Sequence, residues 1–285
     1  MKVRFFLEAP INNNMTMTPP NIIIYSNPRS GTTLLHHTLL LFFQEYYGDY
    51  YCDLHEFFTT SHMTTRHRNN IDEINSITYE QNNNILIKTY KPADTESNDF
   101  EEELQQRISQ WNNCVIADNN QPFITKIFHK NLIDHNFSNT IFDHSLNLVL
   151  VRKNVQDMIL SFIISNSNNN WFYYENENIE TLRGSLIGDI DIIRIHLERN
   201  KLFLENIPNI PNALIIDYDE LNDYEYFYQV IIDMGIVDIR ELHAMEIFDN
   251  IQLKRKIIPT PYTMDRIDYF KNANEIKTLM DEYCS

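Results

Sequence analysis

The stretch Asn21-Ile-Ile-Ile-Tyr-Ser-Asn-Pro-Arg-Ser-Gly-Thr-Thr-Leu-Leu35 decides the fold. Its apolar first half predicts a buried strand, because a short run of β-branched and aromatic residues ends at turn-forming residues. The residues from Pro28 to Gly31 predict a tight turn, and those from Thr32 onward predict an amphipathic helix. The stretch therefore predicts a strand, turn and helix in succession.

The turn of this stretch carries groups that suit a phosphate. Gly31 allows close approach of the backbone, and Arg29 supplies a permanent cation where a bridging oxygen would gain charge during group transfer. Hydroxyl groups stand beside the unpaired amides of the helix N-terminus, and they belong to Ser30, Thr32 and Thr33. The turn predicts a phosphate cradle. Residue types alone leave open that Ser30 and Thr32 only cap the helix.

Strands alternate with helices along the rest of the chain. Apolar runs predict strands at 22–25, 85–88, 123–128, 146–151 and 213–216. Helical spacing predicts helices at 32–43, 100–111, 154–165, 187–206, 223–234 and 275–283. This order predicts an α/β fold with three layers, in which a mainly parallel central sheet is flanked by helices. We expect one domain over 1–285, with its core at about 21–221 and a helical or loop closure at 222–285.

Charge and cysteine content exclude several classes of protein. The chain has 23 Lys and Arg against 40 Asp and Glu, a formal charge of -17 that disfavours nucleic-acid and anionic membrane partners. An anionic ligand would need a local basic pocket. The three cysteines lack CxxC spacing, which argues against a disulfide framework and a cysteine-rich zinc site.

The sequence also shows no signal-peptide pattern and no long apolar run, so we expect a soluble, cytoplasmic protein.

A second strand, basic turn and helix is predicted for Leu148-Val-Leu-Val-Arg-Lys-Asn-Val-Gln-Asp-Met-Ile-Leu-Ser161. Asp157 and Ser161 are four residues apart and so share one helical face. Arg152 and Lys153 offer cations and Ser161 offers a hydroxyl, which are the groups that a second phosphate needs. Taken by itself, the basic pair Arg152 and Lys153 is more simply interpreted as two surface residues at the end of a strand. Its occurrence about a hundred residues after the first turn favours a shared ligand.

The segment Pro28-Arg-Ser-Gly-Thr-Thr33 resembles the 5′-phosphosulfate loop of sulfotransferases that use 3′-phosphoadenylyl sulfate (PAPS). It resembles the arginine version of that loop, seen in tyrosylprotein and many bacterial or viral members. The second segment resembles the family's 3′-phosphate motif, although Lys153 stands where the family normally has arginine and Arg152 lies one residue earlier. Either residue could hold that phosphate. The resemblance extends over about 21–221 and implies the P-loop-like sulfotransferase fold, with PAPS as cosubstrate.

The resemblance also implies a base and a second cation. Families with the arginine loop place a glutamate base after the first helix, and Glu56 stands 27 residues after Arg29. Apolar neighbours of Glu56 would raise its proton affinity; His55 is a local competitor. Lys126 resembles the lysine that helps to hold the leaving phosphate or the sulfonate. His129 is an inexact match to the histidine base of hormone-type members.

Two later segments resemble parts of the same family. The turn Tyr218-Asp-Glu-Leu221 is similar to the family's Tyr-Glu-Asp-Leu-like turn, which we interpret as architectural. The basic run Lys254-Arg-Lys256 is similar to a C-terminal loop that closes the nucleotide site, but it lacks that loop's glycine. A solvated basic run is the favoured interpretation.

The sequence thus predicts a PAPS-dependent sulfotransferase (EC 2.8.2 type) that moves a sulfonate to a carbohydrate, tyrosyl or small-alcohol hydroxyl by in-line displacement. Arg29 and Lys126 would offset charge on the leaving oxygen, and Glu56 would take the acceptor proton. No metal is expected, because no Asp/Glu/His cluster at ligand spacing accompanies the loops. The phosphate loop GxxxxGK[ST] is absent. An ATP-dependent phosphotransferase with an atypical loop and a non-catalytic nucleotide-binding protein of the same fold are the alternatives.

Overall fold

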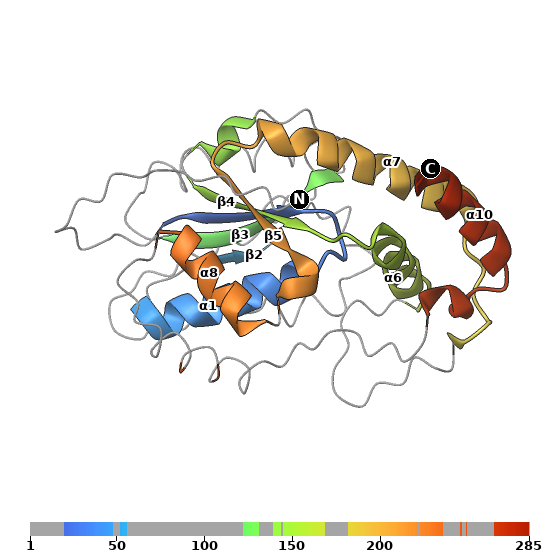
Figure 1. Ribbon diagram of the computed structural model, residues 1–285, viewed down its shortest axis with the longest axis horizontal. Helices are drawn as coiled ribbons and strands as arrows, with labels where there is room; N and C mark the ends of the chain where they lie inside the picture. The colour runs from blue at the N-terminus through green and yellow to red at the C-terminus, as the bar shows by residue number, and fades with distance from the viewer. Residues whose placement is uncertain are drawn as a thin grey trace, which may run out of the picture.

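A parallel sheet forms the centre of the computed structural model (Figure 1). The structure describes residues 20–47, 52–55, 122–130, 139–143, 145–168, 182–221, 223–235, 246, 249 and 265–284. Within these residues the sheet has five strands: β1 (Ile22–Ser26), β2 (Cys52–His55), β3 (Phe123–Phe128), β4 (Leu146–Val151) and β5 (Ala213–Asp217). Their order is β2-β3-β1-β4-β5, and every neighbouring pair is parallel.

Helices cover both faces of this sheet. The longer ones among the described residues are α1 (Thr32–Tyr47), α6 (Val155–Asn168), α7 (Ile190–Asn206), α8 (Tyr224–Asp233) and α10 (Ala273–Cys284). In Figure 1, α1 and α8 lie below the sheet and α7 lies above it. This arrangement confirms the predicted α/β fold with three layers. Among the described residues, none of the helices has the length and apolar character needed to cross a bilayer.

The alternating side chains of β1 build two separate cores. Ile22 and Ile24 pack with buried residues of α1 and α8, whereas Ile23 and Tyr25 pack with Phe203 of α7. All five residues of β1 are buried, as expected for a central strand of a parallel sheet. A third cluster joins α6, α7 and α10 to the 3₁₀ helix η6 (Arg266–Tyr269). The C-terminal part of the chain is thereby packed against α6.

Most predicted elements agree with the structure to within a few residues. The strands predicted near 22–25, 123–128, 146–151 and 213–216 correspond to β1, β3, β4 and β5. The edge strand β2 was not predicted, because Cys52-Asp-Leu-His55 is short and has no continuous apolar run. The strand predicted at 85–88 and the helix predicted at 100–111 lie outside the described residues.

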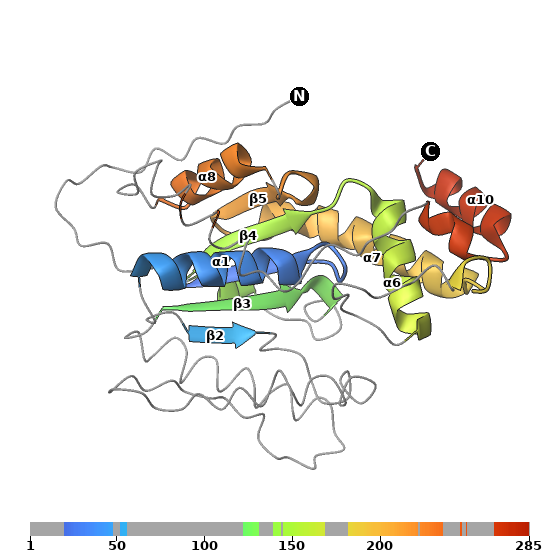
Figure 2. The same cartoon turned by 90° about the horizontal axis from the view of Figure 1, so that it is seen from below.

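The topology places a switch point, where open α/β sheets have a crevice, at the carboxyl ends of β1 and β4. These strands are hydrogen-bonded neighbours, yet the chain leaves β1 toward β2 on one side and leaves β4 toward β5 on the other. Ligands of open α/β sheets bind at such a switch point, because the two diverging loops leave room between them. Figure 2 shows α6 beyond the same ends of the strands. Both predicted phosphate motifs therefore meet at one place.

A buried aromatic cluster joins the sheet to α7. The Tyr25 hydroxyl bonds the His129 Nδ1 atom and accepts a hydrogen bond of 3.0 Å from the Asn206 side chain. The Phe142 and Phe203 rings lie with their centroids 5.5 Å and 5.3 Å from that of Tyr25. Burial, aided by the charge of Arg199, lowers the pKa of His129 from 6.5 to about 4. His129 is only 2% exposed, so its protonation would place a charge in the core.

Acidification should destabilise the chain through His129. Between pH 6.5 and pH 4 the unfolded chain binds a proton at this histidine that the folded chain excludes, so stability falls as the pH is lowered through this window. At pH 5 this contribution is on the order of 2 kcal/mol. We predict that urea unfolding of His129→Gln loses less free energy than the wild type between pH 7.5 and pH 5. Equal losses in the two proteins would contradict this origin of the pH dependence.

Candidate functional site

The turn after β1 has an unusual backbone. Arg29 has φ +65° and Gly31 has φ +81°, both in the left-handed region that favours glycine. For Arg29 this conformation costs on the order of 1 kcal/mol. A Cβ atom on Gly31 would stand 2.2 Å from the Tyr218 ring, far closer than any van der Waals contact. Gly31 is therefore needed for both its φ angle and its lack of a side chain.

The hydroxyl groups of this turn bond other parts of the fold. The Ser30 hydroxyl donates to the Met158 sulfur of α6 at 3.2 Å, and the Ser26 and Thr32 hydroxyls are 2.5 Å apart. Neither Ser30 nor Thr32 hydroxyl bonds a described amide of α1, so the interpretation of the two as plain helix caps is not supported. The first described backbone bond of the helix runs from Leu35 N–H to the Gly31 carbonyl, at 3.0 Å.

Hydrogen bonds join the two predicted phosphate motifs. Arg29 Nε donates to Ser161 Oγ at 3.2 Å, across 132 residues of chain. Arg152 Nη1 donates to the Arg29 carbonyl at 3.1 Å. The left-handed conformation of Arg29 thus coincides with a carbonyl that faces Arg152 and a side chain that reaches α6. The turn after β1, the turn after β4 and the first half of α6 form one cluster.

Arg152 lies at the centre of this cluster. Its guanidinium bonds Asp157 at 3.2 Å, and its Cζ atom is 4.4 Å from the centroid of the Tyr218 ring. Arg266 of η6 bonds the same Asp157 oxygen. Arg152 is 8% exposed, and its buried Nε atom has no hydrogen-bond partner among the described residues. Burial lowers the pKa of this guanidinium, so a bound anion would offset the cost of keeping its charge inside.

The neighbouring Lys153 points away from the cluster. Its side chain is 73% exposed and pairs with Asp217 at the end of β5, and this hydrogen bond raises the pKa of the ammonium group. The two cations that the sequence left as alternatives therefore differ in orientation: Arg152 faces the turn after β1, and Lys153 faces the surface.

Lys126 brings a further cation beneath the first turn of α1. It pairs with Ile24 in the register of β3 and β1 and is only 1% exposed. Its Nζ atom donates to Thr33 Oγ1 at 3.3 Å. Burial of an ammonium group is costly unless it is hydrogen-bonded or paired with an anion. Lys126 thus lies within hydrogen-bonding reach of the same turn that carries Arg29.

The structure separates the candidate bases. His129 is held in the aromatic core by Tyr25, where it has little access to a ligand. His55 ends β2, for which the structure describes only the backbone. Glu56 lies outside the described residues, as does the basic run at 254–256. No group of three or more His, Cys, Asp or Glu side chains that could hold a metal ion occurs within the described part of the chain.

Two residues of the cluster were missed by the sequence analysis. Tyr218 stands in the turn interpreted as architectural, yet its ring fills the space between Gly31 and Arg152. Arg266 has no sequence motif around it and joins the cluster because η6 packs against α6. The resemblance of the turn at 218–221 to the family's Tyr-Glu-Asp-Leu-like turn could have indicated Tyr218. Only the tertiary structure indicates Arg266.

Comparison with known proteins assigns the chain to a family. A solved sulfotransferase domain from the Synechococcus PCC 7002 olefin synthase is 15% identical and has a TM-score of 0.35, with 94% of this chain and 95% of that chain covered. No curated protein matches the chain. The family model of the sulfotransferase domain matches residues 19–223, well over half of the 285 residues. The chain therefore belongs to the sulfotransferase domain family, whose members carry out sulfotransfer.

Proposed function

We propose that this chain is a PAPS-dependent sulfotransferase that moves a sulfonate to a hydroxyl group of a carbohydrate, tyrosyl or small-alcohol acceptor. The observation that carries the proposal is the hydrogen bond between Arg29 and Ser161, because it joins the turns after β1 and β4 at one crevice. A nucleotide with anionic groups at both its 5′ and 3′ positions needs two phosphate sites within a ribose's reach.

The residues of the crevice fit such a nucleotide. The turn at 28–33 offers Arg29 and the helix N-terminus of α1, and Lys126 of β3 reaches the same turn, which suits the 5′-phosphosulfate. Arg152, Arg266 and Ser161 suit the 3′-phosphate. The buried Nε atom of Arg152, which has no hydrogen-bond partner among the described residues, supports this fit, because a phosphate oxygen can accept its hydrogen bond.

Charged groups in and near the turn at 28–33 have roles in the proposed reaction. Bound PAPS supplies an activated sulfonate and leaves as adenosine 3′,5′-bisphosphate (PAP). Arg29 and Lys126 neutralise charge that develops on the bridging oxygen, and such a donor ordinarily changes the rate by a factor of ~100 to 1,000. Glu56 stays our prediction for the base, because burial of His129 in the core disfavours that alternative.

Arg152 is our choice over Lys153 for the 3′-phosphate. Its side chain faces the turn after β1, whereas Lys153 is exposed and paired with Asp217. Arg266 belongs to the segment after 221, so its contact with Asp157 supports the proposal that 222–285 closes the site within one domain. Cytoplasmic localisation stays a prediction from the sequence.

Calorimetry with PAP and ADP tests the proposal. The wild type should bind PAP more tightly than ADP, because only PAP carries a 3′-phosphate. Arg152→Gln should weaken PAP binding by about 100-fold, since it removes a charge-assisted contact to a desolvated anion, and should weaken ADP binding much less, since ADP loses only the support that Arg152 gives to the Arg29 carbonyl. Lys153→Gln is the matched control, and its effect on PAP should be less than about threefold.

Three outcomes would contradict the proposal. Equal, weak binding of PAP and ADP by the wild type would remove the basis for a PAPS site. Selective binding of MgATP would favour the phosphotransferase alternative. Tight PAP binding without ³⁵S-sulfonate transfer from PAPS to phenol, hexose or tyrosyl-peptide acceptors would favour the non-catalytic alternative.

A glycine comparison tests the geometry of the turn. Gly31→Ala introduces both a strained φ angle and a clash with Tyr218. Gly235→Ala introduces only the strain, because no atom of the described residues lies within 4 Å of the new Cβ. We expect Gly235→Ala to lower the free energy of unfolding by ~1 kcal/mol and to leave PAP affinity unchanged.

Gly31→Ala should lower the free energy of unfolding further and weaken PAP binding by about tenfold or more, since the ring beneath Arg152 must move. Both quantities follow from chemical denaturation and calorimetry. Identical behaviour of the two variants would show that the contact between Gly31 and Tyr218 is unimportant.

A further inference from the structure

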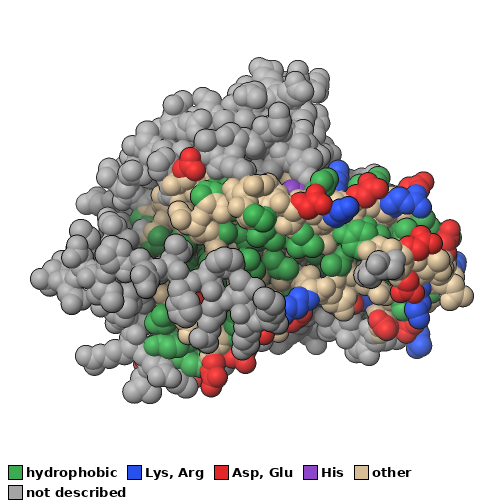
Figure 3. All heavy atoms as spheres, turned by 45° about the horizontal axis from the view of Figure 1, so that its top comes forward, with side chains coloured by type: hydrophobic (Ala, Val, Ile, Leu, Met, Phe, Trp, Pro, Cys, Tyr) green, Lys and Arg blue, Asp and Glu red, His purple; other side chains and the backbone are tan. Residues whose placement is uncertain are grey.

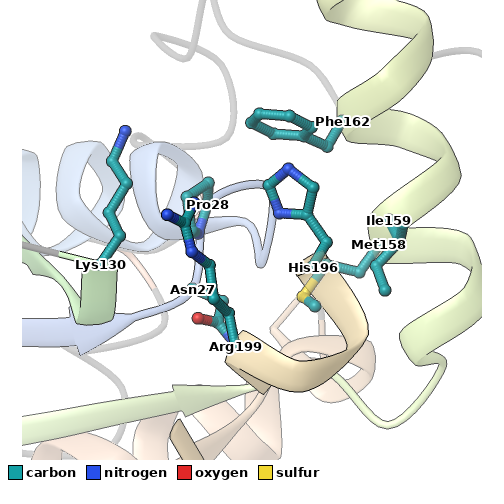
Figure 4. A pocket seen from close by; sticks show the side chains of 8 residues that line it. All are labelled: Asn27, Pro28, Lys130, Met158, Ile159, Phe162, His196 and Arg199. Carbon is teal, nitrogen blue, oxygen red and sulfur yellow. The ribbon is translucent and has the colours of Figure 1, made fainter. Parts of the chain in front are cut away.

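A hollow opens beside the turn after β1, between α6 and α7 (Figure 4). Its empty space, counted together with the open solvent at its mouth, is about 350 Å³, so it is a shallow, open depression and not an enclosed cavity. Its described lining comes from the turn, from the end of β3 and from the two helices: Asn27, Pro28, Lys130, Met158, Ile159, Phe162, His196 and Arg199. Asn27 and Pro28 directly precede Arg29, so a ligand in the hollow lies next to the proposed donor site.

The hollow is fixed to the turn by direct contacts. The Asn27 side chain donates to the Asn200 side chain of α7 at 2.9 Å, and the Ser30 hydroxyl donates to the Met158 sulfur. The Phe162 ring lies over the His196 ring, with 4.1 Å between centroids (Figure 4). The hollow therefore has a formed wall on each side.

The chemistry of the lining is apolar on one side and basic on the other. Met158, Ile159 and Phe162 of α6 supply the apolar wall, and Lys130 and Arg199 supply two cations. None of the described lining residues is a carboxylate, although the chain carries a formal charge of -17. Figure 3 shows one face of the molecule, on which acidic and basic side chains lie close together toward the right-hand end.

The pKa of His196 reflects its burial and the positive charges around the hollow. Burial first, and then the charges of Arg199 and Lys130, lower the pKa of its imidazole to about 4. His196 is consequently neutral at pH 7, so it offers an uncharged ring to an apolar group. Because His196 is uncharged, Lys130 and Arg199 are the only charged side chains among the described lining residues that can act on a bound anion.

We propose that this hollow binds the acceptor of the sulfotransfer reaction, and that the acceptor carries a carboxylate or sulfate next to an apolar face. The anion would pair with Lys130 and Arg199, and the apolar face would pack on Phe162 and Met158. The inference rests on the proposed function, because it assumes that the donor occupies the neighbouring crevice. An aryl carboxylate and a uronic acid share the required chemistry.

Two matched pairs of probes test this inference by calorimetry on the complex with PAP. One pair is 4-hydroxyphenylacetate and 4-hydroxyphenylacetamide, and the other is methyl β-D-glucuronide and methyl β-D-glucoside. In at least one pair the anionic probe should bind about tenfold more tightly than its neutral partner, as expected for a charge-assisted contact. The pair that shows the preference identifies the aryl or sugar source.

Variants of the hollow separate this inference from the proposed function. Lys130→Gln with Arg199→Gln should abolish the anion preference and leave PAP affinity within about twofold. Lys201→Gln is the matched control, because it removes an exposed cation of α7 that does not line the hollow, and it should retain the preference. Absence of a preference in both pairs, or its survival in the double variant, would overturn the inference. Failure of PAP binding itself would instead refute the proposed function.

Discussion

The hydrogen bonds of Arg29 and Arg152 hold the site together. Arg29 reaches α6 through Ser161, and Arg152 bonds the Arg29 carbonyl, so the turns after β1 and β4 keep a fixed separation. The parallel pairing of β1 with β4 makes this possible, because it brings the two turns to one edge of the sheet while the chain diverges on either side. Residues from distant parts of the sequence then need only reach this crevice to take part in it.

The cluster also concentrates positive charge in an acidic protein. The guanidinium groups of Arg152 and Arg266 both bond Asp157, and Tyr218 offers its ring to that of Arg152. Burial of several cations is expensive without an anion, which explains why Asp157 accepts from both Arg152 and Arg266. The chain as a whole carries a formal charge of -17, so the positive charge of this cluster is local.

The sequence predicted the central fold because its signals are local. Four strands, and the helices that follow three of them, are marked by apolar runs and turn residues, as in the segment at 21–35, and the structure agrees with them. The strand β2 escaped prediction because it is four residues long and, among the described strands, pairs only with β3. Proximity of Arg29 and Ser161 could be inferred from two motifs, whereas the choice between Arg152 and Lys153 could not. That choice depends on which side chain turns inward after β4. The partners that decide it come from two separate segments, Asp157 from α6 and the adjacent pair Asp217 and Tyr218 from the end of β5. Arg266 depends in the same way on the packing of η6.

Helix α6 serves two neighbouring places with adjacent residues. Asp157 and Ser161 contact the arginine cluster, while Met158 and Phe162 form a wall of the hollow. The same stretch of α6 therefore contacts both the arginine cluster and the hollow. A displacement of α6 when a ligand occupies one of them would change the shape of the other. Thermodynamic linkage makes such an influence reciprocal. Binding of the donor should consequently change the affinity for the acceptor, and the reverse, before any bond is exchanged. Such coupling would give this small fold an ordered binding of its two substrates without a separate regulatory domain.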